Sequence, residues 1–517
     1  MIELRLSEEN YEYDVRGLLM AFYPNEEIEK KAYSCEYPIF DVPRTKNMGW
    51  ETSEPDSAPS GAWRRQLLVE FGQERIRVTL HCRDENGVSG IGRSFSGTAD
   101  VEGADRSAAK CALKRVLYGL LREDTHRELP WGTLTGIRPT KIAMGFLEAG
   151  RSKAEIAAYM QKEYLVSPEK TALSLEIAEK ERQLLREIDY ENGFSLYVGI
   201  PFCPTICLYC SFSSYPFGRF AGQADAYVEA LERELTATAE IFQGKQLNTV
   251  YFGGGTPTTL LPEQLDRLLA CVEKRFDCSG LREFTVEAGR PDSIGKEKLQ
   301  VLRQHGITRI SINPQTMNQE TLDRIGRRHT VEQVRDAFGL ARQMGFDNIN
   351  MDLILGLPGE GLGDVRHTME ELKTLRPDSI TVHSLAVKRA SRLSQCREQY
   401  AHMSMENSDE AMAVASEGAR ILGLSPYYLY RQKNMTGNLE NVGFAVPGKE
   451  GIYNILIMEE KQTIAACGAG SISKRVDPDG RIERRENVKD VVQYIERIGE
   501  MIGRKRKLFG QLLMKER

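Results

Sequence analysis

Between residues 194 and 386 the chain alternates short apolar runs rich in β-branched residues with longer amphipathic stretches. The short runs are typical of buried β-strands, and the stretches with apolar residues at helical spacing predict helices. Helices are expected, for example, over 224–242 and 331–344. Six strands are predicted, over 194–200, 247–253, 282–288, 308–314, 348–355 and 378–386.

Strands that alternate with helices favour a parallel sheet with right-handed crossovers. Six such units are fewer than the eight that close a TIM barrel. The pattern therefore predicts an α/β fold built on a partial, TIM-like (β/α)6 barrel. In such folds the functional groups gather at the carboxyl ends of the strands, so the residues that follow the predicted strands are the candidates for chemistry.

The sequence on either side of the barrel differs in pattern, which predicts domains over 1–190, 191–390 and 391–517. The first contains strand-like runs, a helix and a long helical stretch that ends near Glu187, as in a small α+β domain joined to the barrel by helices. Within it, 43–62 is rich in Pro, Ser and Gly and predicts a flexible loop. The last region is a mixed, mainly helical extension with a Gly- and Asn-rich centre, and we expect it to cover the substrate.

Composition narrows the class of protein. The 517 residues are 41% hydrophobic and 28% charged, which is typical of globular chains with more than one core. The net charge of -5 argues against nucleic acid as the main partner. No apolar run is long enough to span a membrane, and the first residues lack the basic and apolar segments of a secretory signal. We expect a cytoplasmic protein with no membrane partner.

Three of the ten cysteines, Cys203, Cys207 and Cys210, lie on one short loop directly after the first predicted strand. Three thiolates can bind three irons of a [4Fe-4S] cubane and leave the fourth iron open to another ligand. Ser211 and Phe212 follow, so the loop offers no fourth cysteine. Three buried structural thiols, or a zinc site that lacks one ligand, are the alternatives.

The next strands also end in candidate ligands. The segment GGGTPT (253–258) follows the second strand, and its glycines would let the backbone approach a ligand closely, although a turn alone also explains them. Glu287 ends the third strand, Gln315 follows the fourth and Asp352 lies within the fifth. Such residues often only satisfy backbone groups or solvent, so their joint occurrence is what suggests a site.

The C-x3-C-x2-C spacing matches the signature of radical S-adenosylmethionine (SAM) enzymes. Together with YVGIPFC, FGGGTPT, GRRH (326–329), DLILGLP (352–358) and HSLA (383–386), it makes the segment from about 190 to 450 resemble the oxygen-independent coproporphyrinogen III oxidase family. The best-known members carry a further cysteine where this chain reads CLYCSF. The flanks WGTLTGIRPTK (131–141) and YYLYRQKNMTGNLENVGFA (427–445) resemble instead the HemZ-type coproporphyrinogen dehydrogenase branch.

The resemblance implies a role for each matching position. The three cysteines would hold a [4Fe-4S] cluster, whose open iron chelates the amino and carboxylate groups of SAM. Tyr197, Gly254 and Glu287 match contacts to this SAM, and Tyr197, beside both SAM and cluster, is the expected catalytic residue. A second SAM would contact the positions that match Tyr209, Gly255, Thr256, Gln315, Arg327, Asp352 and Ala386.

In the resembled enzymes an electron from the cluster cleaves SAM and leaves a 5'-deoxyadenosyl radical, which takes hydrogen from a porphyrinogen propionate. Loss of CO2 and an electron leaves a vinyl group, and two propionates of coproporphyrinogen III become the two vinyls of protoporphyrinogen IX. This implies oxidative decarboxylation in anaerobic haem biosynthesis, with a tetrapyrrole substrate and a flavodoxin or ferredoxin as electron donor. A monomer is expected.

Recognition of an anionic tetrapyrrole calls for basic side chains near the pocket. Four are candidates by position, although solvated surface charges are the simpler explanation: Arg219, Arg328, Arg431 and Lys433. His329 and His383 are further candidates, for which satisfied polar groups are the simpler explanation. Gly468 and Gly470 could line the cavity, and a tight turn explains them equally well.

Three other functions compete. Relatives that lack the additional cysteine include haem chaperones, which bind haem and pass it to targets. A radical SAM haem-degrading methyltransferase would share the cluster and the fold. A structural α/β protein with a cysteine loop is the third alternative. The presence of Gln315, Arg327 and Asp352 favours the decarboxylase.

Overall fold

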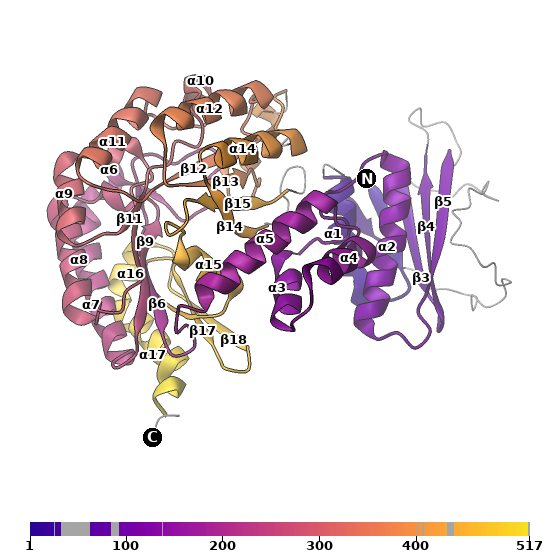
Figure 1. Ribbon diagram of the computed structural model, residues 1–517, viewed down its shortest axis with the longest axis horizontal. Helices are drawn as coiled ribbons and strands as arrows, with labels where there is room; N and C mark the ends of the chain where they lie inside the picture. The colour runs from indigo at the N-terminus through magenta and orange to yellow at the C-terminus, as the bar shows by residue number, and fades with distance from the viewer. Residues whose placement is uncertain are drawn as a thin grey trace. The chain divides into compact units, whose positions relative to one another are not determined.

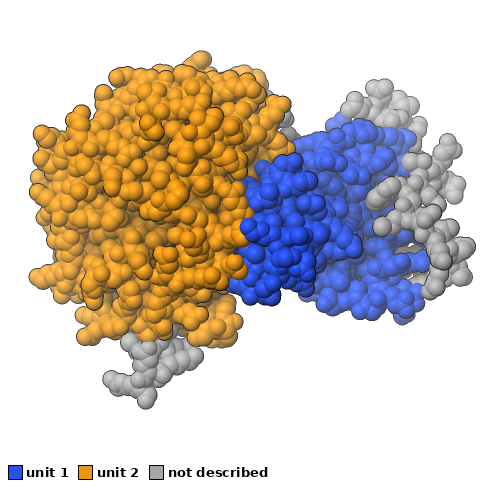
Figure 2. All heavy atoms as spheres, in the orientation of Figure 1, with its two compact units in different colours: residues 1–175 blue, residues 176–517 orange. Residues whose placement is uncertain are grey.

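The computed structural model describes residues 1–24, 26–32, 63–83, 92–136, 138–400, 402–405, 408–431 and 439–514. The chain forms two compact units, Met1–Leu175 and Glu176–Arg517 (Figure 2). The expected loop over 43–62 and the candidate Lys433 lie outside the described residues. Among the described residues, no helix combines the length and the apolar character needed to cross a bilayer.

The first unit is a five-stranded sheet with the order β2-β1-β3-β4-β5. Two of its helices, α1 (Glu12–Phe22) and α2 (Arg106–Thr125), pack with the sheet in one apolar core. β1 pairs in parallel with both β2 and β3. β4 pairs antiparallel with β3, and β5 pairs antiparallel with β4. The strands are β1 (Ile2–Leu6), β2 (Ile28–Lys30), β3 (Arg65–Phe71), β4 (Arg75–Cys82) and β5 (Arg93–Asp100).

A buried carboxylate ties this sheet to the end of α2. Asp124 accepts hydrogen bonds from the Tyr23 hydroxyl at 2.8 Å, Arg65 Nε at 2.7 Å and the Cys82 thiol at 3.2 Å. Because every donor points at one buried acid, the network fixes the helix end on the strands. The unit continues with α3 (Thr140–Glu148), α4 (Lys153–Tyr164) and α5 (Pro168–Leu185), the last of which crosses the division between the units.

The second unit contains the predicted partial barrel. Its six strands lie side by side in chain order, and each pairs in parallel with the next. They form an open sheet, so the predicted α/β fold with a partial TIM-like barrel is confirmed. The strands are β6 (Phe194–Ile200), β9 (Leu247–Gly254), β10 (Glu283–Glu287), β11 (Arg309–Ser311), β12 (Ile349–Leu355) and β13 (Ser379–Ser384).

Amphipathic helices connect these strands and lie along the outside of the sheet (Figure 1). Their apolar stripes face the strands because that packing removes both surfaces from water. The helices are α6 (Phe217–Phe220), α7 (Ala224–Ile241), α8 (Pro262–Arg275), α9 (Lys296–Gln304), α10 (Gln319–Arg324), α11 (Val331–Gln343) and α12 (Leu362–Leu375).

The region after residue 390 extends the same sheet at both edges, which the sequence pattern did not indicate. At one edge β16 pairs in parallel with β6, and β17 and β18 follow it. At the other edge β15 pairs antiparallel with β13, and β14 with β15. The added strands are β14 (Ser425–Tyr430), β15 (Asn441–Ala445), β16 (Thr463–Cys467), β17 (Ile472–Val476) and β18 (Ile482–Glu486).

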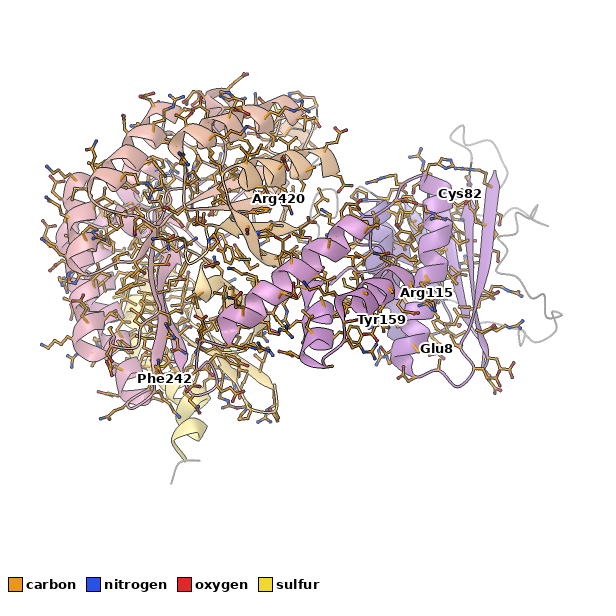
Figure 3. The ribbon with its side chains drawn as sticks, in the orientation of Figure 1. Glu8, Cys82, Arg115, Tyr159, Phe242 and Arg420 are labelled. Carbon is orange, nitrogen blue, oxygen red and sulfur yellow. The ribbon has the colours of Figure 1, made fainter. Side chains whose placement is uncertain are left out.

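The helices of this region are α13 (Arg392–Gln395), α14 (Asp409–Ile421), α15 (Ile452–Glu459), α16 (Val491–Glu496) and α17 (Ile498–Met514). The last packs against α7 and β17. Phe242, at the end of α7, lies between two aromatic rings, with centroids 4.2 Å from Phe194 and 4.8 Å from Phe509 (Figure 3). The C-terminal helix is therefore part of the barrel's outer layer.

Candidate active site

The three clustered cysteines lie on the loop that leaves β6. A short strand β7 (Phe202–Cys203) pairs with β8 (Tyr215–Pro216), so the loop closes on itself and presents the thiols between its two ends. The Cys210 amide donates to the Cys207 carbonyl at 3.2 Å, which forms a tight turn. Cys207 is buried, whereas Cys203 and Cys210 are half-buried.

Neighbouring segments hold this loop in place. The Leu208 amide donates to the Ile325 carbonyl and the Leu393 amide donates to the Leu208 carbonyl, both at 2.9 Å. The Thr205 hydroxyl donates to the Gly326 carbonyl at 3.1 Å. The loop is therefore fixed by the segments that follow α10 and β13, and not only by its own turns.

Two guanidinium groups face one of the thiols. Arg290 Nη1 lies 3.9 Å from Cys207 Sγ and Arg327 Nη1 lies 4.0 Å from it, and both arginines are buried. The Thr256 hydroxyl lies 3.6 Å from Cys203 Sγ. Burial raises the pKa of Cys203 to about 11, so its thiolate needs positive charge nearby.

This donor set fits an iron–sulfur cluster. Three thiols supply soft ligands, and two N–H groups can donate to a ligand sulfur. Among the described residues, no three His, Cys, Asp or Glu side chains converge as ligands of a single metal ion. In a cubane each thiolate binds a different iron, so the sulfurs stand farther apart than the ligands of one ion.

The glycine-rich segment packs directly against the cysteine loop. The Gly255 amide donates to the Ile200 carbonyl and the Thr256 amide to the Phe202 carbonyl, both at 2.7 Å. A Cβ on Gly255 would lie 2.5 Å from the Phe202 carbonyl oxygen, so no larger residue fits there. Gly254 has a φ of +105°, which favours glycine. The close approach thus explains the need for glycine beside the cysteines.

A stack of tyrosine rings lies beside this segment. Tyr197 on β6 stacks with Tyr251 on β9 and with Tyr453 on α15, with ring centroids 6.2 Å apart in both pairs. The Tyr251 hydroxyl donates to Glu287 Oε1 at 2.5 Å. Burial raises the pKa of Glu287 to about 7, against the lowering effect of the Tyr251 hydrogen bond. The carboxyl can therefore change protonation near neutral pH.

Tyr453 reaches the stack because a buried acid holds the start of its helix. Glu283 on β10 accepts hydrogen bonds from the backbone amides of Ile452 and, at 3.4 Å, Tyr453. A carboxylate at a helix N-terminus satisfies free amides and complements the helix dipole. The C-terminal region thereby contributes a side chain to the carboxyl ends of the barrel strands.

The predicted ligands on the later strands form one connected group. Arg327 Nη2 donates to the Asn313 carbonyl at 2.6 Å, and Asn313 Oδ1 accepts from the Asp352 amide at 3.2 Å. The Gln315 amide donates to the Asp352 carbonyl at 3.0 Å, and Gln315 has a φ of +70°. Arg327 also donates to the Tyr209 hydroxyl at 3.2 Å, which links this group to the cysteine loop.

Asp352 has a histidine as a close partner. His383 Nε2 lies 3.8 Å from Asp352 Oδ2, and Asn350 donates to Oδ1 at 2.7 Å. Burial would raise the pKa of Asp352, but the hydrogen bonds and the charge of His383 hold it below its usual range. The Asp352 charge in turn contributes to the raised pKa of Glu287. Asp352 is therefore an ionised carboxylate, and Glu287 near it is a carboxyl that can change protonation.

The other candidate residues differ in how exposed their side chains are. Ala386 is half-buried just past β13, while Arg219 and Arg328 are exposed. Arg431 is buried, and burial lowers its pKa to about 10. His329 is fully buried with no hydrogen bond to either ring nitrogen within the described chain.

The two candidate glycines of the C-terminal region have a structural explanation. Gly468 and Gly470 have φ angles of +103° and +71°. A Cβ on Gly468 would lie 2.3 Å from the Gly199 carbonyl oxygen. The turn must approach β6 closely, and only glycine allows this.

Several residues of this site were not recognised from the sequence pattern, among them Arg290, Tyr251 and Tyr453. Tyr251 had a signal, because it pairs with Tyr197 across β6 and β9 and precedes the glycine segment by two residues. Arg290 follows Glu287 closely, beyond the predicted strand end. Tyr453 had no signal in the sequence, since it lies 166 residues beyond Glu287 in the chain and only tertiary packing brings it to the stack.

The partial barrel with three cysteines after its first strand defines a radical SAM domain, and residues 197–372 match the radical SAM superfamily. The oxygen-independent coproporphyrinogen-III oxidase-like protein HemZ of Bacillus subtilis is 44% identical over 411 residues, which cover 78% of this chain and 82% of the relative. The chain belongs to the HemZ-type branch of the oxygen-independent coproporphyrinogen III oxidase family. Membership implies a [4Fe-4S] cluster and SAM as cofactors.

Other relatives match a shorter part. The haem chaperone HemW of Bacillus subtilis is 39% identical over 195 residues, which cover 38% of this chain and 51% of the chaperone. The oxygen-independent coproporphyrinogen III oxidase of Escherichia coli is 33% identical over 196 residues, 38% of this chain and 42% of the oxidase. The solved structure of coproporphyrinogen III oxidase (HemN) from Escherichia coli covers 62% of this chain and 73% of its own, with 24% identity and a TM-score of 0.49.

Proposed function

We propose that this protein oxidatively decarboxylates two propionates of coproporphyrinogen III and so forms protoporphyrinogen IX. The observation that supports this most is the connected group of Tyr209, Arg327, Asp352 and Gln315 beside the cysteine loop. These residues match the contacts of a second SAM in the resembled oxidases. A protein that only binds haem has no need to hold two SAM molecules.

The cofactors would be held as follows. Cys203, Cys207 and Cys210 would ligate the cluster, and the half-buried Gly254 and Gly255 would border the SAM that binds its open iron. Glu287 would accept hydrogen bonds from this SAM as a carboxylate, with Tyr197 beside it. When bound, the cluster and SAM supply a carbon radical that removes hydrogen from the substrate. The second SAM would contact seven residues: Tyr209, Gly255, Thr256, Gln315, Arg327, Asp352 and Ala386.

The reaction balances for each propionate. One hydrogen atom leaves the β-carbon to the radical, the bond to the carboxylate breaks, CO2 departs, and one electron passes to a one-electron acceptor. The two carbons that remain form the vinyl group. The chain must hold the anionic tetrapyrrole in one orientation, since positioning of a single C–H bond decides which product forms. A flavodoxin or ferredoxin supplies the reducing electron, and the protein acts as a monomer.

The test is anaerobic turnover. The reconstituted protein is mixed with SAM, dithionite, a one-electron acceptor and coproporphyrinogen III, and protoporphyrinogen and CO2 are measured. Two CO2 per protoporphyrinogen are expected. Cys203→Ala is the control, because loss of one thiolate removes a cluster ligand and should abolish SAM cleavage. Stable haem binding without decarboxylation would instead indicate a role like that of the HemW chaperone.

A further inference from the structure

An exposed aromatic ring lies at the edge of the cysteine loop. Phe212 is two residues beyond Cys210, and 70% of its surface is exposed. The stretch 201–218, which includes the loop, contains no charged residue. A single exposed ring is common on protein surfaces. This ring differs from a single exposed ring because a cation lies next to it, with Lys388 Nζ 6.0 Å from the centre of the ring.

The segment that follows β13 brings positive charge to this ring. Lys388, Arg389 and Arg392 are exposed, and they are the only charged residues between 386 and 396. The hydrogen bond from the Leu393 amide to the Leu208 carbonyl fixes the segment against the cysteine loop. Within the described part of the chain, none of the three cations forms an ion pair. The chain as a whole has a net charge of -5, so the positive charge of this patch is opposite in sign to that of the whole chain.

We propose that Phe212, Lys388, Arg389 and Arg392 form the docking surface for an acidic one-electron carrier protein that reduces the cluster. The inference rests on the radical SAM chemistry of the proposed function. In the step, the carrier loses one electron and the cluster gains it, and no bond forms or breaks. A carrier seated on Phe212 lies two residues from a cluster ligand, which keeps the electron path short.

Charge complementarity selects this partner. Electron-transfer complexes bury little area, and opposite charges steer their encounter more than they add affinity. An exposed ring beside cations that have no ion-pair partner among the described residues fits that description. The same cations would also attract tetrapyrrole carboxylates, and the experiment separates these two ligands by varying the reductant.

The experiment measures release of 5'-deoxyadenosine from SAM without tetrapyrrole, using either reduced bacterial flavodoxin or dithionite. Because the assay contains no tetrapyrrole, its result does not depend on whether the protein decarboxylates coproporphyrinogen III. The charge-reversed variant is Lys388→Glu with Arg389→Glu, and Phe212→Ser tests the ring. The matched control is Lys274→Glu with Arg275→Glu, two exposed cations at the end of α8, which leads to the opposite ends of the strands.

We expect the flavodoxin-driven rate of the charge-reversed variant to fall about tenfold at low salt, with the dithionite-driven rate unchanged. Added salt should slow the wild-type protein and leave the variant nearly unaffected. The control should match the wild type with both reductants. An equal loss with both reductants, or no loss with flavodoxin, would overturn the proposal.

Discussion

The hydroxyl of Tyr251 donates a 2.5 Å hydrogen bond to Glu287, and so joins the strand before the glycine segment to the acidic end of the next strand. Removal of this hydroxyl in Tyr251→Phe should raise the pKa of Glu287 further, because the hydrogen bond lowers it. Fewer molecules then carry the carboxylate at pH 7. Since a hydrogen bond to a charged group contributes roughly 1.5–3 kcal/mol, we expect SAM affinity to fall about tenfold or more in equilibrium binding.

Tyr453→Phe provides the matched control for this substitution. It keeps a ring in the stack and removes a hydroxyl that makes no hydrogen bond within the described residues. SAM affinity should change little. Equal losses in the two variants would show that the hydroxyl of Tyr251 acts through the stack and not through Glu287.

The titration of Glu287 should affect the stability of the cofactor-free protein. Burial raises its pKa from 4.5 to about 7 in the folded protein. A raised acid stabilises the fold fully below its unfolded pKa, and this contribution is lost as pH rises through the folded value. The free energy of unfolding of the wild type, measured with denaturant, should therefore fall by about 1–3 kcal/mol relative to that of Glu287→Gln between pH 4.5 and 7.5. A difference that is constant with pH would contradict the raised pKa.

Arg290 should influence the reduction potential of the reconstituted cluster. Its guanidinium lies 3.9 Å from Cys207 Sγ and is held by Asp292, with Nη2 2.8 Å from Oδ2. Positive charge near a cluster favours the reduced state. Arg290→Met should lower the midpoint potential by about 50 mV, close to a tenfold change in a one-electron equilibrium. Arg290→Lys, which keeps the charge, should shift it less, and equal shifts in both variants would exclude a charge effect.

The last helix is anchored by a buried ion pair. Lys505 Nζ lies 2.9 Å from Glu234 Oε1, and it also donates to Cys467 Sγ at 3.0 Å. Removal of one partner leaves an uncompensated buried charge, so Lys505→Met should lower the free energy of unfolding by about 3–5 kcal/mol. Lys507→Met, on the exposed side of the same helix, is the control and should be nearly neutral. Similar small effects in both would show that the pair is not a stabilising anchor.

The sequence by itself determined the positions of the six barrel strands and the three clustered cysteines that are the candidate cluster ligands. Alternating apolar runs and amphipathic stretches force buried strands and covering helices, and the structure places all six strands within the predicted segments or one residue beyond them. The cysteine spacing is local, so its chemistry can be inferred without a fold. The same holds for the glycine segment, whose need for a close backbone approach is encoded in three consecutive glycines.

Only the tertiary structure decided which distant side chains join these ligands. Tyr453 reaches Tyr197 because Glu283 holds the start of α15, and no local pattern in α15 indicates this contact. The strands after residue 390 extend both edges of the barrel sheet through pairings with β6 and β13. Such pairings depend on backbone hydrogen bonds between segments far apart in the chain, and hydrophobic periodicity specifies that a strand is buried but not which strand lies beside it.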